Sequence, residues 1–191
     1  VRAIENELRK YDPGMLEKPR WLVLNKGDLL NDETRAERAK AIYRERYIQG
    51  GGALEADVFP GILEVIAASK AAGMINSLAT SKGYSGVKIV GEHFDFLNHF
   101  DFLGTADPAA GRHSKADVIE YAILGLKAAG ADTSSVVLIG DRIHDIEGAR
   151  EHGIEVGLVK WGYGTETEWA EADFVVDNVT ELAAALGLRA S

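Results

Sequence analysis

The stretch VVLIGDRIHDIEGAR, residues 136–150, contains the strongest indication of the fold of this chain. It begins with four aliphatic residues, a run typical of a strand buried on both faces of a parallel sheet. Gly140 follows, and a glycine at a strand end lets the backbone approach a ligand closely. The stretch therefore predicts a strand, a polar turn that is open to a ligand, and a helix.

The same alternation of strand and helix extends along the whole chain. The predicted strands span residues 21–24, 74–79, 100–104, 136–139, 155–159 and 173–176, and the predicted helices span residues 1–10, 32–47, 62–72, 86–93, 114–129, 146–152 and 180–186. This order predicts an α/β fold with three layers, a parallel sheet covered by helices on both faces. The loops after Leu24, Ala79 and Ile139 are then expected at one edge, where the carboxyl ends of the strands meet.

Composition narrows the classes of function. Of the 191 residues, 46% are hydrophobic and 27% are charged, the balance of an ordinary globular protein. The formal net charge of −9 argues against a broad nucleic-acid surface but not against a small anionic substrate. The chain has no cysteine, which excludes disulfides, thiolate metal sites and cysteine nucleophiles. The sequence contains neither an apolar run long enough to span a membrane nor a visible signal peptide, so a cytoplasmic location without membrane contact is expected, whereas the oligomeric state is not indicated.

Two carboxylates follow the strand at residues 136–139. Asp141 and Asp145 are four residues apart, where a turn leads into a helix, and two such oxygen ligands can share Mg²⁺. The alternative interpretation makes Asp145 a charge that stabilises the positive end of the helix dipole, and Asp141 a turn residue.

Polar residues elsewhere add to this site. Thr80 ends a second apolar strand, where its hydroxyl and the following residues, beginning with Ser81, can bind a phosphate oxygen. Lys115 stands at a helix start and can bring an ammonium group to the same place. Taken alone, Thr80 is typical of a strand-end cap and Lys115 of a solvated helix residue. In the order Thr80, Lys115, Asp141, Asp145, these residues predict a site for a small phosphorylated molecule and Mg²⁺.

Residues 42–188 resemble a known family through a series of motifs in the family's order. The motifs are YRERY, VFPGILEVI, LATSKG, HFDFLNHFDFLG, RHSKADVIEYAI, VVLIGDRIHDIEGAREHGI, WGYGTETE and ADFVV. They are similar to the core of haloacid-dehalogenase-type phosphatases of the phosphoglycolate phosphatase branch. The resemblance implies a Rossmann-like core and Mg²⁺-assisted phosphoryl transfer to an aspartate. It also implies that Thr80 binds phosphate, Lys115 steadies the phosphate and the nucleophile, Asp141 ligates the metal, and Asp145 supports the metal through its waters.

The front of the chain departs from the family pattern. The family has Asp-x-Asp-Gly-Thr after its first strand, with a nucleophile followed by a general acid/base, whereas this chain has Asn25 and Gly27 at those positions. A carboxamide has no anionic oxygen to attack phosphorus, and glycine has no titratable group. Asp28 lies one residue beyond the position of the general acid/base. The helical cap that closes the site in many relatives is also largely missing before Phe59.

Residues 1–40 instead resemble the segment of Obg-type GTPases that contains the guanine-reading Asn-Lys-x-Asp motif. That resemblance assigns the motif to Asn25, Lys26 and Asp28, with Gly27 at its variable position. The sequence has no Gly-x-x-x-x-Gly-Lys-Ser/Thr loop, which argues against GTP hydrolysis. The chain therefore resembles a chimera within one α/β domain, residues 1–191. Residues 1–47 are expected to supply the first strand, and residues 48–191 the core.

Three functional hypotheses follow from the sequence. The first is a Mg²⁺-dependent phosphomonoester hydrolase fold, weakly active or inactive because Asn25 and Gly27 replace the aspartate pair. The second is a non-catalytic scaffold of engineered or recombined origin. The third is a guanine-nucleotide binder that uses residues 25–28.

Overall fold

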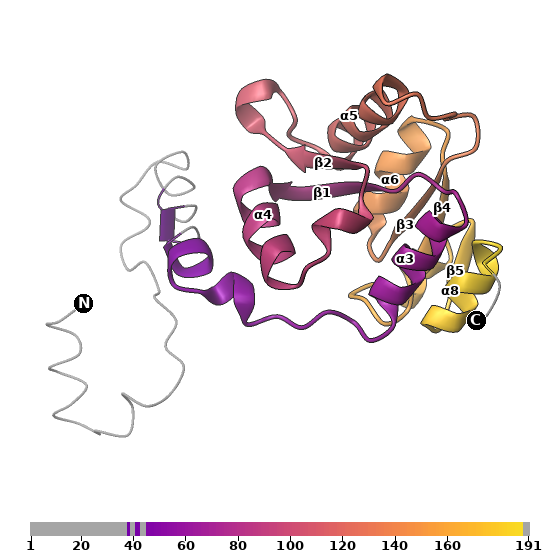
Figure 1. Cartoon of the computed structure of the whole chain (residues 1–191), viewed down its shortest axis with the longest axis horizontal. Helices are drawn as coiled ribbons and strands as arrows, with labels where there is room; N and C mark the ends of the chain where they lie inside the picture. Colours follow the sequence, from indigo (N-terminus) through magenta and orange to yellow (C-terminus); the bar gives the residue numbers. More distant parts are fainter. Residues whose placement is uncertain (1–37, 39–40, 43–44, 189–191) are drawn as a thin grey trace, which may run out of the picture. The chain divides into compact units, whose positions relative to one another are not determined.

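The computed structural model describes residues 38, 41–42 and 45–188 (Figure 1). The chain divides into two compact units, residues 1–45 and 46–191, and the helices and strands from Gly52 onward belong to the second unit. The predicted helix at residues 1–10 and the predicted strand at residues 21–24 lie outside the described residues. The same holds for most of the predicted helix at residues 32–47 and for the expectation that residues 1–47 supply the first strand.

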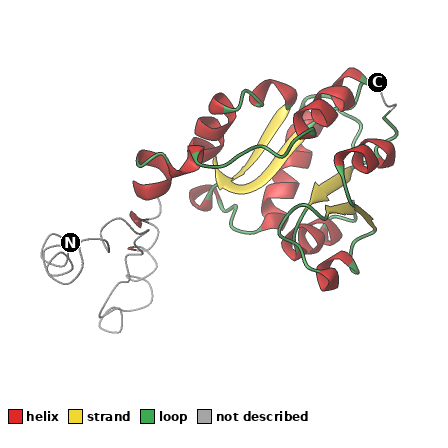
Figure 2. Cartoon of the chain, turned by 90° about the horizontal axis from the view of Figure 1, so that it is seen from below, coloured by secondary structure: helices red, strands yellow, loops and turns green. Residues whose placement is uncertain are grey.

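Strands and helices alternate along the second unit (Figures 1 and 2). The strands are β1 (Ser77–Gly83), β2 (Phe102–Ala106), β3 (Val137–Gly140), β4 (Glu155–Val159) and β5 (Phe174–Val176). The α-helices are α3 (Ile62–Ala71), α4 (Tyr84–His93), α5 (Lys115–Ala128), α6 (Ile143–Glu151), α7 (Glu166–Trp169) and α8 (Val179–Ala185). Short helical turns are the π-helix η3 (Glu45–Gln49) and the 3₁₀ helices η4 (Gly52–Leu54), η5 (Leu97–His99) and η6 (Pro108–Ala110).

The described strands form two parallel sheets, β1-β2 and β3-β4-β5, rather than the single sheet expected from the sequence. Figure 2 shows these two groups of strands in yellow, with helices around them. Among the described strands, β1 pairs only with β2, and β3 pairs only with β4. One side of β1 and one side of β3 therefore have no described strand beside them. The two sheets are not joined because β1 and β3 do not pair with each other.

Strand β4 is buried on both faces, and it shows why the three-stranded sheet has helices on each side. Val156 and Leu158 pack with Ile146 of α6 in one apolar cluster. Val159, one residue further along, packs with Leu182 of α8 in the other. Successive residues of a strand point to opposite faces, so β4 needs an apolar layer above and below it. The predicted α/β architecture with parallel strands and helices on both faces is confirmed.

Helix α5 covers the two-stranded sheet and packs beside α6 (Figure 1). The helices approach closely at Gly148, because a Cβ there would lie 2.9 Å from Ile119 Cδ1 and 3.1 Å from the Ala116 amide nitrogen. Gly104 of β2 likewise allows α5 to pack closely against the strand, since a Cβ at position 104 would lie 2.9 Å from the Cβ of Ala122. These contacts fix the position of the amino end of α5, where Lys115 stands.

Two boundaries near the predicted site differ from the sequence-based expectation. Strand β1 was expected at residues 74–79 but runs from Ser77 to Gly83, so that Thr80 lies within it. The regular pairing nevertheless ends at Thr80, opposite Thr105, because the ladder is irregular between Thr80 and Gly83. Helix α6 begins at Ile143 rather than Ile146, because the carboxylate of Asp145 caps its first turn.

No helix within the described part of the chain is long and apolar enough to cross a membrane.

Candidate functional site

Lys115 connects β1 of the two-stranded sheet to the first turn of α6, the helix that follows β3. Ser114 caps α5 in a reciprocal capping box with Asp117, so the helix begins at Lys115. The Lys115 Nζ donates to the Ala79 carbonyl oxygen at 2.7 Å and lies 2.7 Å from Asp145 Oδ1. The two side chains are mostly buried, with 16% and 9% of their surfaces exposed. The structure therefore brings Lys115 and Asp145 together beside Ala79, the neighbour of Thr80 in the sequence.

Asp145 uses both carboxylate oxygens within the protein. Its Oδ1 pairs with Lys115, and its Oδ2 accepts the backbone amides of Asp141 and Arg142, each at 3.0 Å. The third residue of a helix is a favourable place for a negative charge, because the first amides have no partner within the helix. Asp145 thus caps the helix and pairs with a buried cation. A metal ion would meet it through water more readily than directly.

Asp141 lies in the turn between β3 and α6 and contacts the loop after β4. Its Oδ2 accepts the backbone amide of Tyr163 at 2.8 Å. Gly162 allows this approach, because a Cβ at that position would overlap the Asp141 side chain. One carboxylate oxygen of Asp141 is therefore held by the loop. The other, Oδ1, has no hydrogen bond to any described residue.

Thr80 and Ser81 stand at the irregular end of β1. The Thr80 hydroxyl accepts the Lys82 amide at 3.1 Å, and this bond turns the chain after the strand. Ser81 is exposed. Lys82, which the sequence analysis did not single out, extends its ammonium to Tyr47, 4.1 Å above the ring centre. Asn25, Gly27 and Asp28 lie outside the described residues.

The described residues fit a weakly held Mg²⁺ better than a tightly bound one. They contain no group of three or more histidine, cysteine or acidic residues placed to hold a metal ion. Mg²⁺ needs only one or two carboxylates, because it keeps several waters and takes further oxygens from a phosphate. Asp141 can offer its second oxygen for direct ligation, while Asp145 is restricted to contact through water.

Glu168 holds the loop after β4 against the start of α6, and the sequence analysis missed it. Its Oε1 accepts the Ile143 amide and the Arg142 Nε, both at 3.1 Å, and its Oε2 accepts the Thr165 amide at 2.7 Å. These donors, the Ile143 amide first and then the Arg142 guanidinium, lower the pKa of Glu168 from 4.5 to about 2. The only local signal in the sequence is the spacing from Thr165 to Glu168, which fits a capping box.

Replacing Glu168 by glutamine is expected to destabilise the fold at neutral pH by several degrees in the melting temperature. Because folding lowers the pKa of Glu168, its stabilising contribution is present above about pH 4.5 and is lost as the pH falls toward 2. The difference between wild type and Glu168→Gln should therefore shrink between pH 5 and pH 2. Thermal melts across this range measure it, with Glu166→Gln in the same short helix as the matched control. A difference that does not depend on pH would contradict the assignment.

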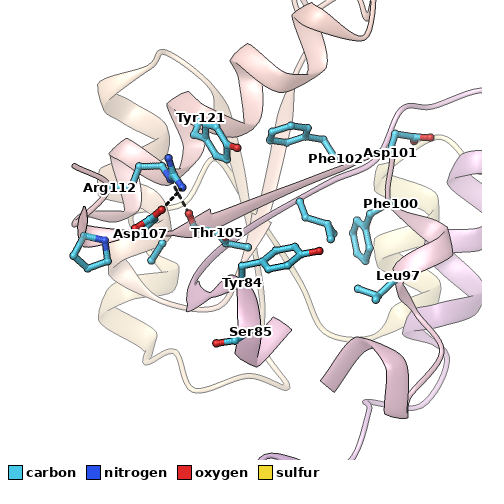
Figure 3. Close-up of a pocket in the computed structure, with 13 residues that line it drawn as sticks. Tyr84, Ser85, Leu97, Phe100, Asp101, Phe102, Thr105, Asp107, Arg112 and Tyr121 are labelled. Carbon is cyan, nitrogen blue, oxygen red and sulfur yellow. Dashed lines mark hydrogen bonds and ion pairs between the residues drawn. The ribbon is translucent and has the colours of Figure 1, made fainter. Parts of the chain in front are cut away.

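A separate hollow of about 780 Å³ lies along β2 and is lined by Thr105, the residue that pairs with Thr80 (Figure 3). Aromatic side chains from three parts of the chain surround it, including Tyr84, Phe100 and Tyr121. The Arg112 guanidinium lies 4.0 Å from the centre of the Tyr121 ring and donates to the Thr105 carbonyl oxygen at 3.0 Å. None of the predicted site residues lines this hollow, so it is distinct from the cluster around Lys115.

Comparison with known proteins decides the family. The family model of haloacid dehalogenase-like hydrolases matches residues 25–159, well over half of the chain. The chain belongs to the haloacid dehalogenase-like hydrolase family. The family and the Rossmann-like α/β fold expected from the sequence are thereby confirmed. The match begins at Asn25, and residues 1–24 lie outside it.

The relatives of this haloacid dehalogenase-like chain include a protein kinase and a probable phosphatase. It is 35% identical to the tyrosine-protein kinase PtkA of Mycobacterium tuberculosis over 140 residues, which are 73% of this chain and 45% of PtkA. It is 31% identical to the probable phosphatase IndB of Dickeya dadantii over 148 residues, 76% of this chain and 62% of IndB. The chain thus spans about half to three fifths of these relatives.

A solved structure agrees with this relationship. The haloacid dehalogenase-like hydrolase SP0104 of Streptococcus pneumoniae matches with a TM-score of 0.69 and 26% identity, over 82% of this chain and 71% of that one. The likeness includes sequence as well as fold.

Proposed function

We propose that this chain carries a Mg²⁺-assisted phosphomonoesterase site that lacks its nucleophile and its general acid/base, so that turnover is weak or absent. The observation that carries the proposal is the Lys115 ammonium, 2.7 Å from both the Ala79 carbonyl oxygen and Asp145 Oδ1. A mostly buried cation between β1 and the start of α6 attracts a small phosphate, and charge-assisted hydrogen bonds to phosphate are strong. IndB, a relative named as a probable phosphatase, supports the same substrate class.

Each described site residue has a role in this proposal. The Thr80 hydroxyl and the exposed Ser81 donate hydrogen bonds to phosphate oxygens, and Lys115 offsets their negative charge. Asp141 would hold Mg²⁺ through its second oxygen, and Asp145 would contact the ion only through water while keeping Lys115 in place. Bound Mg²⁺ supplies positive charge that stabilises the phosphate oxygens as the ester bond breaks.

The weakness of the proposed site comes from two residues outside the described part of the chain. Asn25 corresponds to the nucleophile of the family and has no anionic oxygen, so no phosphoryl group can be transferred to it. Gly27 corresponds to the general acid/base and can neither protonate the leaving oxygen nor activate water.

The substrate is a small phosphorylated molecule, and the acidic chain is expected to bind neither nucleic acid nor membrane in a cytoplasmic location. The resemblance of residues 1–40 to Obg-type GTPases, and with it a chimeric origin, stays a prediction. A guanine-nucleotide binder would give heat with GDP and none with ADP in calorimetry.

Mg²⁺ together with inorganic phosphate is expected to raise the melting temperature of the wild type. At concentrations ten times the dissociation constant the rise should be about 3 °C, because a ligand that binds only the folded state stabilises it by mass action. Differential scanning fluorimetry with Mg²⁺, with phosphate and with both measures the effect.

Asp141→Ala should abolish the part of the shift that depends on Mg²⁺, whereas Asp57→Ala, at an exposed aspartate, should keep it. A wild type whose melting temperature responds to neither ligand would reject the proposed site and favour the non-catalytic scaffold.

A further inference from the structure

The hollow along β2 is lined by none of the residues assigned to the proposed phosphate site, and its walls come from separate parts of the chain (Figure 3). Tyr84 begins α4, Phe100 precedes β2, and Tyr121 belongs to α5. The volume of about 780 Å³ lies within the range of pockets that enclose small ligands, roughly 300–1,000 Å³. The hollow is therefore large enough for a small molecule that contains a ring.

Arg112 is the cation that lines this hollow, and more than half of its hydrogen-bonding capacity is unused. Its side chain is 19% exposed, and its guanidinium lies over the Tyr121 ring. Nε donates to the Thr105 carbonyl oxygen at 3.0 Å, and Nη2 donates to Asp107 Oδ2 at 3.3 Å (Figure 3). A guanidinium has five N–H bonds, so three of them have no acceptor among the described residues.

The two carboxylates that line the hollow are already occupied by other donors. Asp101 accepts the Lys70 ammonium on one oxygen and the Asn76 amide on the other. Both oxygens of Asp107 likewise hold donors, from Arg112 and from the turn after β2. The hollow therefore has donors in excess but no surplus of positive charge. This balance suits a singly charged carboxylate better than a doubly charged phosphate.

Tyr84 offers an aromatic face that no other ring covers. Its side chain lines the hollow, and the residue is 60% exposed (Figure 3). Phe102 packs against Tyr121 with 5.1 Å between the ring centres, and Phe100 packs against Phe96. Among the described residues, Tyr84 has no such contact with a ring or a cation. An uncovered ring gains energy by packing against the flat ring of a ligand.

We infer that the hollow along β2 is a binding site for a small aromatic carboxylate, with the carboxylate on Arg112 and the ring against Tyr84. The planar guanidinium matches the geometry of a carboxylate, and it carries N–H bonds that the protein leaves without acceptors. The inference goes beyond the proposed function and does not depend on it, because the two sites share no residue.

Ligand-observed NMR titrations of the full chain test the site with three matched probes. Benzoate should bind with a dissociation constant about tenfold or more below that of benzamide, which has the same shape but no charge, because hydrogen bonds to a charged group are the stronger ones. Benzoate should also bind roughly three- to tenfold more tightly than cyclohexanecarboxylate, which keeps the charge but has no π face.

Variants assign each preference to its residue. Arg112→Gln should bring the ratio of benzoate to benzamide affinity to about one, whereas Arg150→Gln, at an arginine outside the hollow, should keep it. Tyr84→Ala should bring the ratio of benzoate to cyclohexanecarboxylate affinity close to one, whereas Tyr84→Phe should keep it. Tyr163→Ala removes another exposed tyrosine, which does not line the hollow, and should leave both ratios unchanged.

Equal affinities for benzoate and benzamide in the wild type, or ratios unchanged in Arg112→Gln and Tyr84→Ala, would overturn the inference. Displacement of benzoate by inorganic phosphate with Mg²⁺ would place the anion at the Lys115 cluster and would also overturn it. Thermal melts check that Arg112→Gln folds, and if it does not, the wild-type ratios and the Tyr84 variants decide. A chain that binds benzoate but not phosphate would reject only the proposed function.

Discussion

Replacing both Asn25 and Gly27 by aspartate is expected to raise Mg²⁺-dependent hydrolysis of p-nitrophenyl phosphate by at least about 100-fold. Asn25→Asp restores an oxygen nucleophile, and Gly27→Asp restores a group that protonates the leaving oxygen and then activates water. Positioned acid/base catalysis alone contributes roughly 10²- to 10⁴-fold. Initial rates with and without EDTA measure the gain, and each single variant should show only part of it.

Two controls make this result specific. The pair Asn25→Asp with Gly27→Asn has a side chain of similar size at position 27 but no titratable group, so it should gain far less than the double aspartate variant. Adding Asp141→Ala to the active pair should return the rate to that of the wild type, because the metal ligand is lost. A double aspartate variant no faster than the wild type would show that Asn25 does not correspond to the nucleophile.

The second large effect is expected at Lys115, in the stability of the fold. Lys115→Met leaves the Asp145 carboxylate mostly buried beside α5 without its cation, and breaking a buried ion pair from one side typically costs about 3 kcal/mol or more. For a chain of this length, that cost corresponds to a fall in melting temperature of roughly 6–12 °C. The loss of the bond to the Ala79 carbonyl oxygen acts in the same direction. Urea unfolding followed by circular dichroism measures the free energy directly.

A second substitution tests the cause of this loss. Asparagine at position 145 still accepts the amides of Asp141 and Arg142 through its carbonyl oxygen, but it carries no charge that needs a partner. Lys115→Met with Asp145→Asn should therefore recover much of the stability that Lys115→Met loses. As a matched surface pair, Lys88 and Glu92 are exposed on α4, and Lys88→Met should change stability little. Simply additive costs at positions 115 and 145 would show that the pair does not act as a unit.

The elements of the second unit were predictable because their signal is local. Strand β4 was predicted with its observed bounds, Glu155–Val159, since Gly153 ends the preceding helix and the charged Lys160 follows the apolar run. Thr80 was expected at a strand end but lies inside β1, because the pairing with β2 continues irregularly after it. The division into two sheets was not predictable, since pairing of strands depends on the path of the chain between them.

In the candidate site, the residue types follow from local sequence, whereas their hydrogen-bond partners depend on long-range packing. The sequence by itself determined the alternation of strands and helices, the family, and the residue types at Thr80, Lys115 and Asp141, because periodicity and motif spacing are properties of neighbouring residues. Only the tertiary structure decided the partner of each polar atom. Lys115 bonds to Ala79, 36 residues away, and Glu168 to Arg142, 26 residues away. Such pairs form where packed helices and strands bring distant donors and acceptors to hydrogen-bonding distance, and no local pattern specifies that distance.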